Sequence, residues 1–223
     1  MDTNTLKEYL EETYGYNEPI FINEIKLDNL NGNSLCQYFN HMVNSGNLIR
    51  FDTEIYYLPR QSRLLKKSYL DPLRVVSRKY IRNGSETFGY FSGAYLANQL
   101  RLTTQMPATI EIVTNKESTK GRTVTIGGQS IRLKSPSVMI TEKNVLLLQF
   151  LDAVSASEKY TELPASETTA ILKQYILQNS FTRKQLTDIL PYITAQTVKK
   201  PIKWELIYEF IQYKTIKRLT EKT

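Results

Sequence analysis

The sequence predicts an α+β fold, built from three groups of secondary structure along the chain. First, helical stretches near the N-terminus precede two short β-rich runs that flank a polar turn. Second, the middle of the chain holds a strong hairpin signal, TVTI-GG-QSIRL. Third, apolar residues recur at helical spacing from Glu167 onward. We therefore expect three parts: residues 1–62, residues 63–160 as a mixed α/β domain with β-hairpins, and C-terminal helices over residues 161–223.

The first part has the element order of a winged helix-turn-helix. A helix, a strand, a second helix, a turn, a third helix and a hairpin are expected over residues 3–14, 19–22, 23–30, 31–33, 34–45 and 48–58. Ser34 is expected to cap the third helix and Gly46 to end it. The apolar stripe of that helix consists of Leu35, Phe39, Met42 and Val43.

The second part mixes helices and strands. We expect a helix over residues 68–82, a strand over residues 109–113, and a hairpin that turns at Gly127-Gly128. Ser92 and Thr141 are each expected to cap a further helix.

Several classes of function are disfavoured by the sequence. It has no phosphate-binding glycine loop, no dinucleotide-binding glycine motif, no serine-hydrolase motif and no zinc-protease motif. With one cysteine, Cys36, and one histidine, His41, the chain cannot form an intramolecular disulfide or a site of several such metal ligands. We therefore expect no enzyme, no cofactor and no metal, and we interpret Cys36 as a partly buried core thiol.

The chain also lacks the marks of a membrane or exported protein. No apolar run approaches the roughly 20 residues of a membrane span. The N-terminal segment, MDTNTLKEYLEETYG, is acidic and has no apolar stretch of the signal-peptide kind. We expect a cytoplasmic protein without a membrane partner.

The third helix of the first part carries residues suited to reading DNA. Its polar face is expected to present Ser34, Gln37, Asn40, His41 and Asn44. Asparagine and glutamine can form paired hydrogen bonds with adenine edges in the major groove, and serine can donate or accept. The helix carries no lysine or arginine, so contacts to DNA phosphates must come from elsewhere.

The distribution of charge places most cations after the predicted wing. Residues 1–62 hold four basic and nine acidic residues, a net charge of −5, although the whole chain has +7. The expected tip of the wing, Asp52-Thr53-Glu54, would be repelled by phosphate. We expect phosphate contacts from two sets of residues: Arg50, Arg60, Arg63, Lys66 and Lys67, and a helical stripe of Arg74, Arg78, Lys79 and Arg82.

Three segments of the middle part resemble a known family. These are GYFSGAYLANQLRLTTQMPATIEIVTNK (Gly89–Lys116), RTVTIGGQSIRLKSP (Arg122–Pro136) and ITEKNVLLLQFLDAV (Ile140–Val154). Together with the winged helix before them, they are similar to the AbiEi-like antitoxins of type IV toxin–antitoxin systems, which belong to abortive-infection defence. The resemblance covers roughly residues 21–154.

The resemblance implies a transcriptional regulator that is also an antitoxin. In such proteins the winged helix binds promoter DNA and represses its own operon. The following domain counteracts a toxin similar to nucleotidyltransferases, without needing a stable complex with it. A homodimer would double a weak DNA site. An alternative interpretation is a non-catalytic interaction module, in which the winged helix is structural and the basic second part docks an acidic partner.

Overall fold

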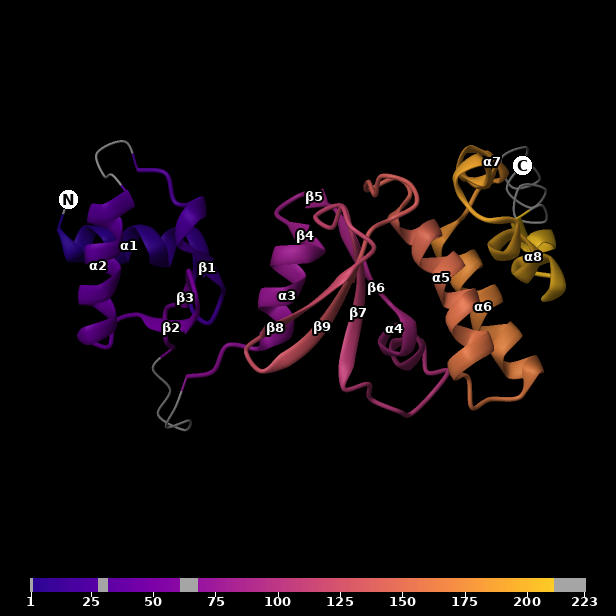
Figure 1. The fold of residues 1–223 in the computed structure, drawn as a ribbon, viewed down its shortest axis with the longest axis horizontal. Coiled ribbons are helices and arrows are strands. Elements are labelled where there is room, and N and C mark those ends of the chain that lie inside the picture. Colours follow the sequence, from indigo (N-terminus) through magenta and orange to yellow (C-terminus); the bar gives the residue numbers. More distant parts are fainter. Residues whose placement is uncertain (1, 28–31, 61–67, 211–223) are drawn as a thin grey trace, which may run out of the picture. The chain divides into compact units, whose positions relative to one another are not determined.

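The computed structural model describes residues 2–27, 32–60 and 68–210 (Figure 1). Its α+β class confirms the sequence prediction. The internal contacts divide the chain into two compact units. The first unit contains Met1–Lys79 and Ile126–Gly128, and the second contains Tyr80–Thr125 and Gln129–Thr223.

The first unit combines helices with a small antiparallel sheet. Its elements are α1 (Thr3–Tyr14), β1 (Ile20–Phe21), η1 (Ile22–Glu24), α2 (Gly32–Asn44), β2 (Ile49–Asp52), β3 (Ile55–Tyr57) and α3 (Pro72–Tyr80). Asp2 begins α1 by accepting a hydrogen bond of 2.8 Å from the Thr5 amide. The strand order is β1-β3-β2. Leu6, Leu10, Phe39, Met42 and Leu58 form the centre of its core.

The expected second helix of the first unit is not found in the part of it that the structure describes. Residues 22–24 form a single 3-10 turn, residues 25–27 have no regular structure, and residues 28–30 lie outside the described residues. Ile20, Ile22 and Ile25 are all buried, and their branched side chains favour extended backbone over helix. The first and third helices and the hairpin agree with the prediction, but α2 begins two residues before Ser34, so Ser34 lies inside the helix and the prediction that it caps the helix is wrong.

The second unit is built on a four-stranded sheet. Its strands are β6 (Gly89–Ser92), β7 (Thr109–Thr114), β8 (Arg122–Ile126) and β9 (Gln129–Lys134), in the order β6-β7-β9-β8. Strand β7 is antiparallel to β6 and parallel to β9. The predicted turn at Gly127-Gly128 is confirmed, because both glycines have the positive φ that a tight hairpin turn needs.

Helices cover one face of this sheet (Figure 1). They are α4 (Gly93–Gln99) and α5 (Val145–Tyr160), and beyond α5 follow α6 (Ala165–Asn179), α7 (Arg183–Ile189), η2 (Leu190–Tyr192) and α8 (Ala195–Lys203). Phe150 of α5 is fully buried, and its ring lies 5.8–6.0 Å from the rings of Tyr175, Phe181 and Phe210. The helices after residue 160 therefore share one core with the sheet and belong to the second unit.

Two further helix caps, at Ser92 and Thr141, do not form as predicted. Ser92 is the residue before α4, but its hydroxyl accepts no hydrogen bond from the helix amides and instead donates to the Asp152 carboxylate at 2.7 Å. Thr141 does not begin α5, because residues 141–144 form a separate turn in which Asn144 accepts from the Thr141 amide at 2.8 Å. In both places a tertiary or turn contact replaces the local cap. Among the described residues, none of the helices has the length and apolar character that a bilayer span requires.

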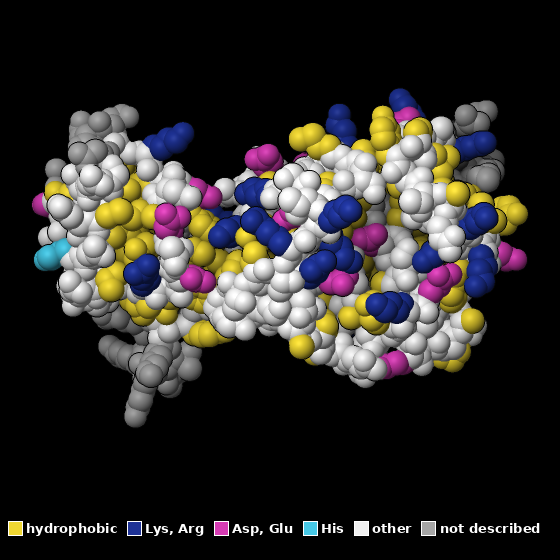
Figure 2. Space-filling view, viewed as in Figure 1, with side chains coloured by type: hydrophobic (Ala, Val, Ile, Leu, Met, Phe, Trp, Pro, Cys, Tyr) yellow, Lys and Arg dark blue, Asp and Glu magenta, His cyan; other side chains and the backbone are white. Residues whose placement is uncertain are grey.

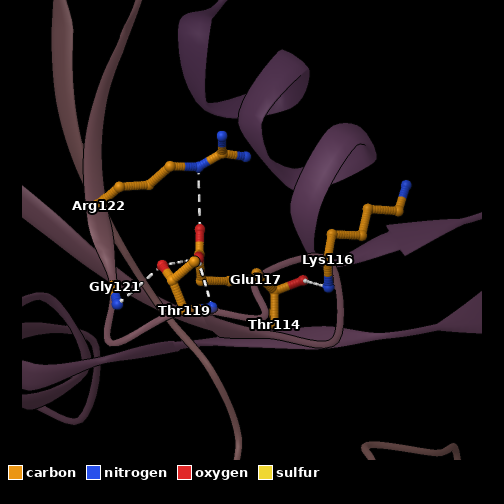
Figure 3. A network of polar contacts seen from close by, with 6 residues as sticks. All are labelled: Thr114, Lys116, Glu117, Thr119, Gly121 and Arg122. Carbon is orange, nitrogen blue, oxygen red and sulfur yellow. Dashed lines mark hydrogen bonds and ion pairs between the residues drawn. The ribbon is translucent and has the colours of Figure 1, made fainter.

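The loop between β7 and β8 is organised around a buried carboxylate (Figure 3). The Glu117 side chain is only 2% exposed, and it accepts hydrogen bonds from the backbone and hydroxyl of Thr119. Arg122 approaches it from β8, with 2.9 Å between Nε and the carboxylate. The hydrogen bonds from Thr119, followed by the charge of Arg122, hold the pKa of Glu117 below its ordinary value.

We expect Glu117→Gln to destabilise the second unit at neutral pH. Because the folded-state pKa is lowered, the ionised form stabilises the fold above the ordinary pKa of 4.5, and this contribution is lost as the pH falls through the folded-state value. Urea unfolding can be followed by the fluorescence of the single tryptophan, Trp204. The difference in free energy of unfolding between wild type and variant should become smaller as the pH is lowered. The exposed Glu86, changed to Gln, is the control. A difference in unfolding free energy that does not change with pH would contradict this explanation.

Candidate nucleic-acid interface

Helix α2 separates a buried face from an exposed polar face. Leu35, Phe39 and Met42 point into the core of the first unit, as their spacing predicts. On the other side, Gln37, Asn40, His41 and Asn44 are exposed, and Ser34 is half-buried. Residues three and four apart lie on one side of a helix, so these amide and imidazole groups form a continuous surface. Such a surface could donate to and accept from base edges.

The end of α2 is fixed by backbone hydrogen bonds that also place the hairpin. Gly46 has a φ of +74° and donates to the Val43 carbonyl at 3.1 Å. The Asn47 and Leu48 amides both donate to the Met42 carbonyl, at 2.9 and 3.1 Å. Strand β2 therefore starts at Ile49, separated from the end of α2 at Asn44 by four residues and by no other element. The sequence predicted this stop at Gly46.

The acidic tip of the hairpin is held against the rest of the sheet. Asp52 accepts from the Thr53 amide at 2.7 Å, and Glu54 has a positive φ of 61°. The Ile22 amide donates to the Glu54 carbonyl at 3.1 Å and extends the pairing of β1 with β3. The tip is thus ordered by strand pairing and presents the charge that phosphate repels.

Two of the predicted phosphate contacts are exposed in the first unit. These are Arg50 on β2 and Arg60 after β3. The Arg50 Nε atom donates to the Asp52 carbonyl oxygen at 3.4 Å, and the Arg60 backbone amide donates to the side-chain oxygen of Asn17 at 3.2 Å. Three others, Arg63, Lys66 and Lys67, lie outside the described residues.

A hollow beside Arg60 adds groups that the sequence reasoning missed. It measures about 580 Å³ and is lined by Lys7, Tyr16, Gly46, Asn47, Pro59 and Arg60. Lys7 comes from α1, where its ammonium lies 3.7 Å from the Glu11 carboxylate. Lysine and arginine from segments far apart in sequence thus line the same hollow. No local pattern could have indicated this, because the two residues meet only through the fold.

The predicted arginine stripe is divided between different partners. Arg74 forms an ion pair with Glu18, and Arg78 forms one with Glu24 at 3.0 Å. Arg78 also donates to the Pro19 carbonyl at 2.8 Å, and its guanidinium lies over the rings of Tyr14 and Phe21 at 5.1 and 5.6 Å. Acidic and aromatic groups of the first unit therefore already bind the two arginines that we expected to face phosphate.

The prediction that Arg82 continues the helical stripe of Arg74, Arg78 and Lys79 is wrong. Helix α3 ends at Tyr80, and Arg82 belongs to a two-residue strand, β4 (Arg82–Asn83), that pairs with β5 (Glu86–Thr87). Gly84, with a φ of +59°, turns the chain between these strands. Arg82 donates to the Gly84 carbonyl at 3.1 Å and lies 3.8 Å from Glu142. Lys79 remains on α3 and is half-buried.

The interpretation of Cys36 as a core thiol is also wrong. Cys36 is exposed on α2, next to Gln37 and four residues before Asn40. Leu35 and Phe39 fill the core at this level of the helix, so the intervening position faces solvent. The thiol lies beside the polar surface.

The charge of the first unit is balanced once α3 is included. Residues 1–79 hold ten basic and ten acidic residues, so the net charge of +7 comes from the remainder of the chain. On the face drawn in Figure 2, Lys and Arg side chains are more numerous over the second unit than over the first. A neutral unit with a polar helix face can bind DNA only weakly through charge.

Comparison with family models gives no match for this sequence, and comparison with curated proteins gives none.

Proposed function

We propose that this protein is a DNA-binding regulator that reads promoter DNA through α2, and that it acts as the antitoxin of a type IV toxin–antitoxin system. The observation that carries the DNA-binding part is the exposed row Gln37, Asn40, His41 and Asn44 on a helix that a hairpin follows directly. Three of the four are amides, the side chains that pair bidentately with adenine. A face needed only for solubility would be served equally well by lysine and glutamate.

The antitoxin part of the proposal rests on the resemblance to AbiEi-like antitoxins. The three resembling segments supply β6, α4, β7, the β8–β9 hairpin and most of α5. They come together in one sheet with its covering helices, so the resemblance concerns a whole layer of the second unit. Under this proposal the protein represses its own operon and counteracts a nucleotidyltransferase-like toxin.

We expect weak, salt-sensitive binding to the promoter. Among the described residues of the first unit, Arg50 and Arg60 are the exposed cations on and next to the hairpin that follows α2, whereas Lys7, Arg74 and Arg78 already form ion pairs with acids. Each phosphate contact contributes about −0.9 to the slope of log affinity against log salt. Changing Arg50 to Gln should therefore reduce the slope by about 0.9 and weaken binding to all sequences alike.

Fluorescence anisotropy of the fragment upstream of the protein's own reading frame measures this directly. The full chain is titrated at several salt concentrations, with Arg183→Gln on α7 as a matched control outside the first unit. Absence of salt-sensitive binding at low ionic strength would exclude the DNA-binding part. Co-expression with the adjacent reading frame tests the antitoxin part. The product of that frame alone should arrest growth of the host cells, and co-expression of this protein should restore growth. Co-purification with that product after nuclease treatment would favour the interaction-module alternative.

A further inference from the structure

A polar cavity of about 350 Å³ lies in the second unit, between the sheet and α5. The sheet contributes Ser92 from β6, Glu111 from β7 and Lys134 from β9, and α5 contributes Asp152, Lys159 and Tyr160. Strand pairing places Ser92 opposite Glu111, and Val113, the neighbour of Lys134 on β7, lies on the same face. Every one of these residues belongs to the second unit. The size falls in the range of about 300–1,000 Å³ that is usual for small-molecule sites.

The inner end of the cavity offers hydrogen-bond acceptors. Asp152 accepts from the hydroxyls of Ser92, at 2.7 Å, and Tyr90, and both of these residues are more than nine-tenths buried. Burial raises the pKa of Asp152, against the opposing effect of the Ser92 hydrogen bond. The Glu111 carboxylate lies against the backbone of Gly93, where a β-carbon would come within 2.4 Å of it. Apolar residues here would cost less to bury than these carboxyl groups, so the polar lining needs an explanation beyond packing.

The outer end of the cavity offers cations and hydroxyl donors. The Lys134 side chain is 43% exposed, and its ammonium lies 2.6 Å from Glu111. Lys159 is exposed at the last turn of α5, and its ammonium lies 4.9 Å from the centre of the Tyr160 ring. Ser135 and Ser137 follow Lys134 and line the same opening. Lysine ammonium groups and serine hydroxyls are common ligands of phosphate.

We propose that this cavity binds a sugar phosphate, either free or as part of a nucleotide, with its hydroxyl groups on Asp152 and Glu111 and its phosphate at Lys159 and Lys134. Carboxylates accept hydrogen bonds from vicinal sugar hydroxyls, as acidic residues do for ribose in dinucleotide sites. The four charged groups sum to zero, so a bare anion gains little in this cavity. A ligand with donors at one end and an anion at the other matches both ends. This inference does not depend on DNA binding, because none of its residues belongs to the first unit.

Isothermal titration of the full chain tests the proposal. Ribose 5-phosphate and the four ribonucleoside monophosphates are compared with ribose and with inorganic phosphate. At least one sugar phosphate should bind more tightly than ribose and phosphate do. Tighter binding of a nucleotide than of ribose 5-phosphate identifies a nucleotide as the source, and equal binding identifies the free sugar phosphate.

Two variants locate the site. Lys159→Gln should weaken sugar phosphate binding by about tenfold or more, the loss expected for a charge-assisted hydrogen bond, and should leave ribose binding unchanged. Lys199→Gln, an exposed lysine on α8, is the matched control and should change nothing. Asp152→Asn should weaken ribose and sugar phosphate equally. If Asp152→Asn fails to fold, the two lysine variants still decide, since both positions are exposed.

Three results would overturn the proposal. The first is the absence of binding by any sugar phosphate at millimolar concentration. The second is inorganic phosphate binding as tightly as the sugar phosphates, which would indicate an anion site alone. The third is equal binding by wild type and Lys159→Gln, which would place the ligand elsewhere. None of these titrations is made with DNA, so the absence of sugar phosphate binding would not affect the DNA-binding proposal.

Discussion

Replacing Arg78 with alanine is expected to lower the stability of the first unit by about 2–4 kcal/mol, slightly less than the loss of one partner from a fully buried ion pair. The Arg78 side chain is 24% exposed and the Glu24 side chain 35%. Alanine would remove the donor to the Pro19 carbonyl, the ion pair with Glu24 and the contact with two aromatic rings. Hydrogen exchange of amides in α1, β1 and β3 measures the loss.

Arg74 provides a matched control one helical turn away. Its ion pair with Glu18 is exposed, with side-chain exposures of 58% and 40%, so Arg74→Ala should cost about 1 kcal/mol or less. Arg78→Lys should lose most of the stability that Arg78→Ala loses, because an ammonium cannot form the forked hydrogen bonds of the guanidinium. Trp204 fluorescence should show the second unit unchanged in all three variants. Equal small effects at Arg74 and Arg78 would show that Arg78 is only a solvated surface residue.

The double change Gln37→Ala with Asn40→Ala is expected to lower the preference for promoter over unrelated DNA by about thirtyfold or more, since each of the two bidentate base contacts discriminates by about 1–3 kcal/mol. Affinity for unrelated DNA should change little, because neither residue is charged. Competition binding with promoter and scrambled fragments gives the ratio. Both residues are exposed, so the stability of the unit should hold.

Two controls make the result specific. Asn4→Ala removes the same amide chemistry from an exposed position on α1 and should leave the preference intact. Arg50→Gln should weaken binding to promoter and scrambled DNA equally. Loss of preference in Asn4→Ala, or an unchanged ratio in the double variant, would show that α2 does not read bases.

Elements with strong local signals were predictable from the sequence. Helix α1 has the predicted bounds, the apolar stripe of α2 is buried up to the half-buried Val43, and the β8–β9 hairpin turns at Gly127-Gly128. In each case the pattern is set by residues close in sequence, through helical or alternating spacing or the positive φ of glycine. The exposed polar face of α2 follows from the same spacing.

Features that depend on distant residues were not predictable. Ser92 has the position of a helix cap, yet its hydroxyl donates a hydrogen bond to Asp152, sixty residues later. Arg78 looks like part of a basic stripe, yet it binds groups that lie between residues 14 and 24. The cavity of the second unit combines three strands and one helix, each unremarkable alone. Only the folded sheet brings these side chains together.

The most direct test of α2 as the DNA reader uses the chain's single cysteine, Cys36, which is exposed on that helix beside Gln37. An iron chelate attached to the Cys36 thiol generates hydroxyl radicals that cut DNA only within a short distance. If α2 lies in the major groove of the promoter, the labelled protein should cut both strands at one short position, and Cys36→Ala treated with the same reagent should cut nowhere. Cutting that is absent, or spread evenly along the fragment under conditions of saturating binding, would contradict the placement of α2 on the bases.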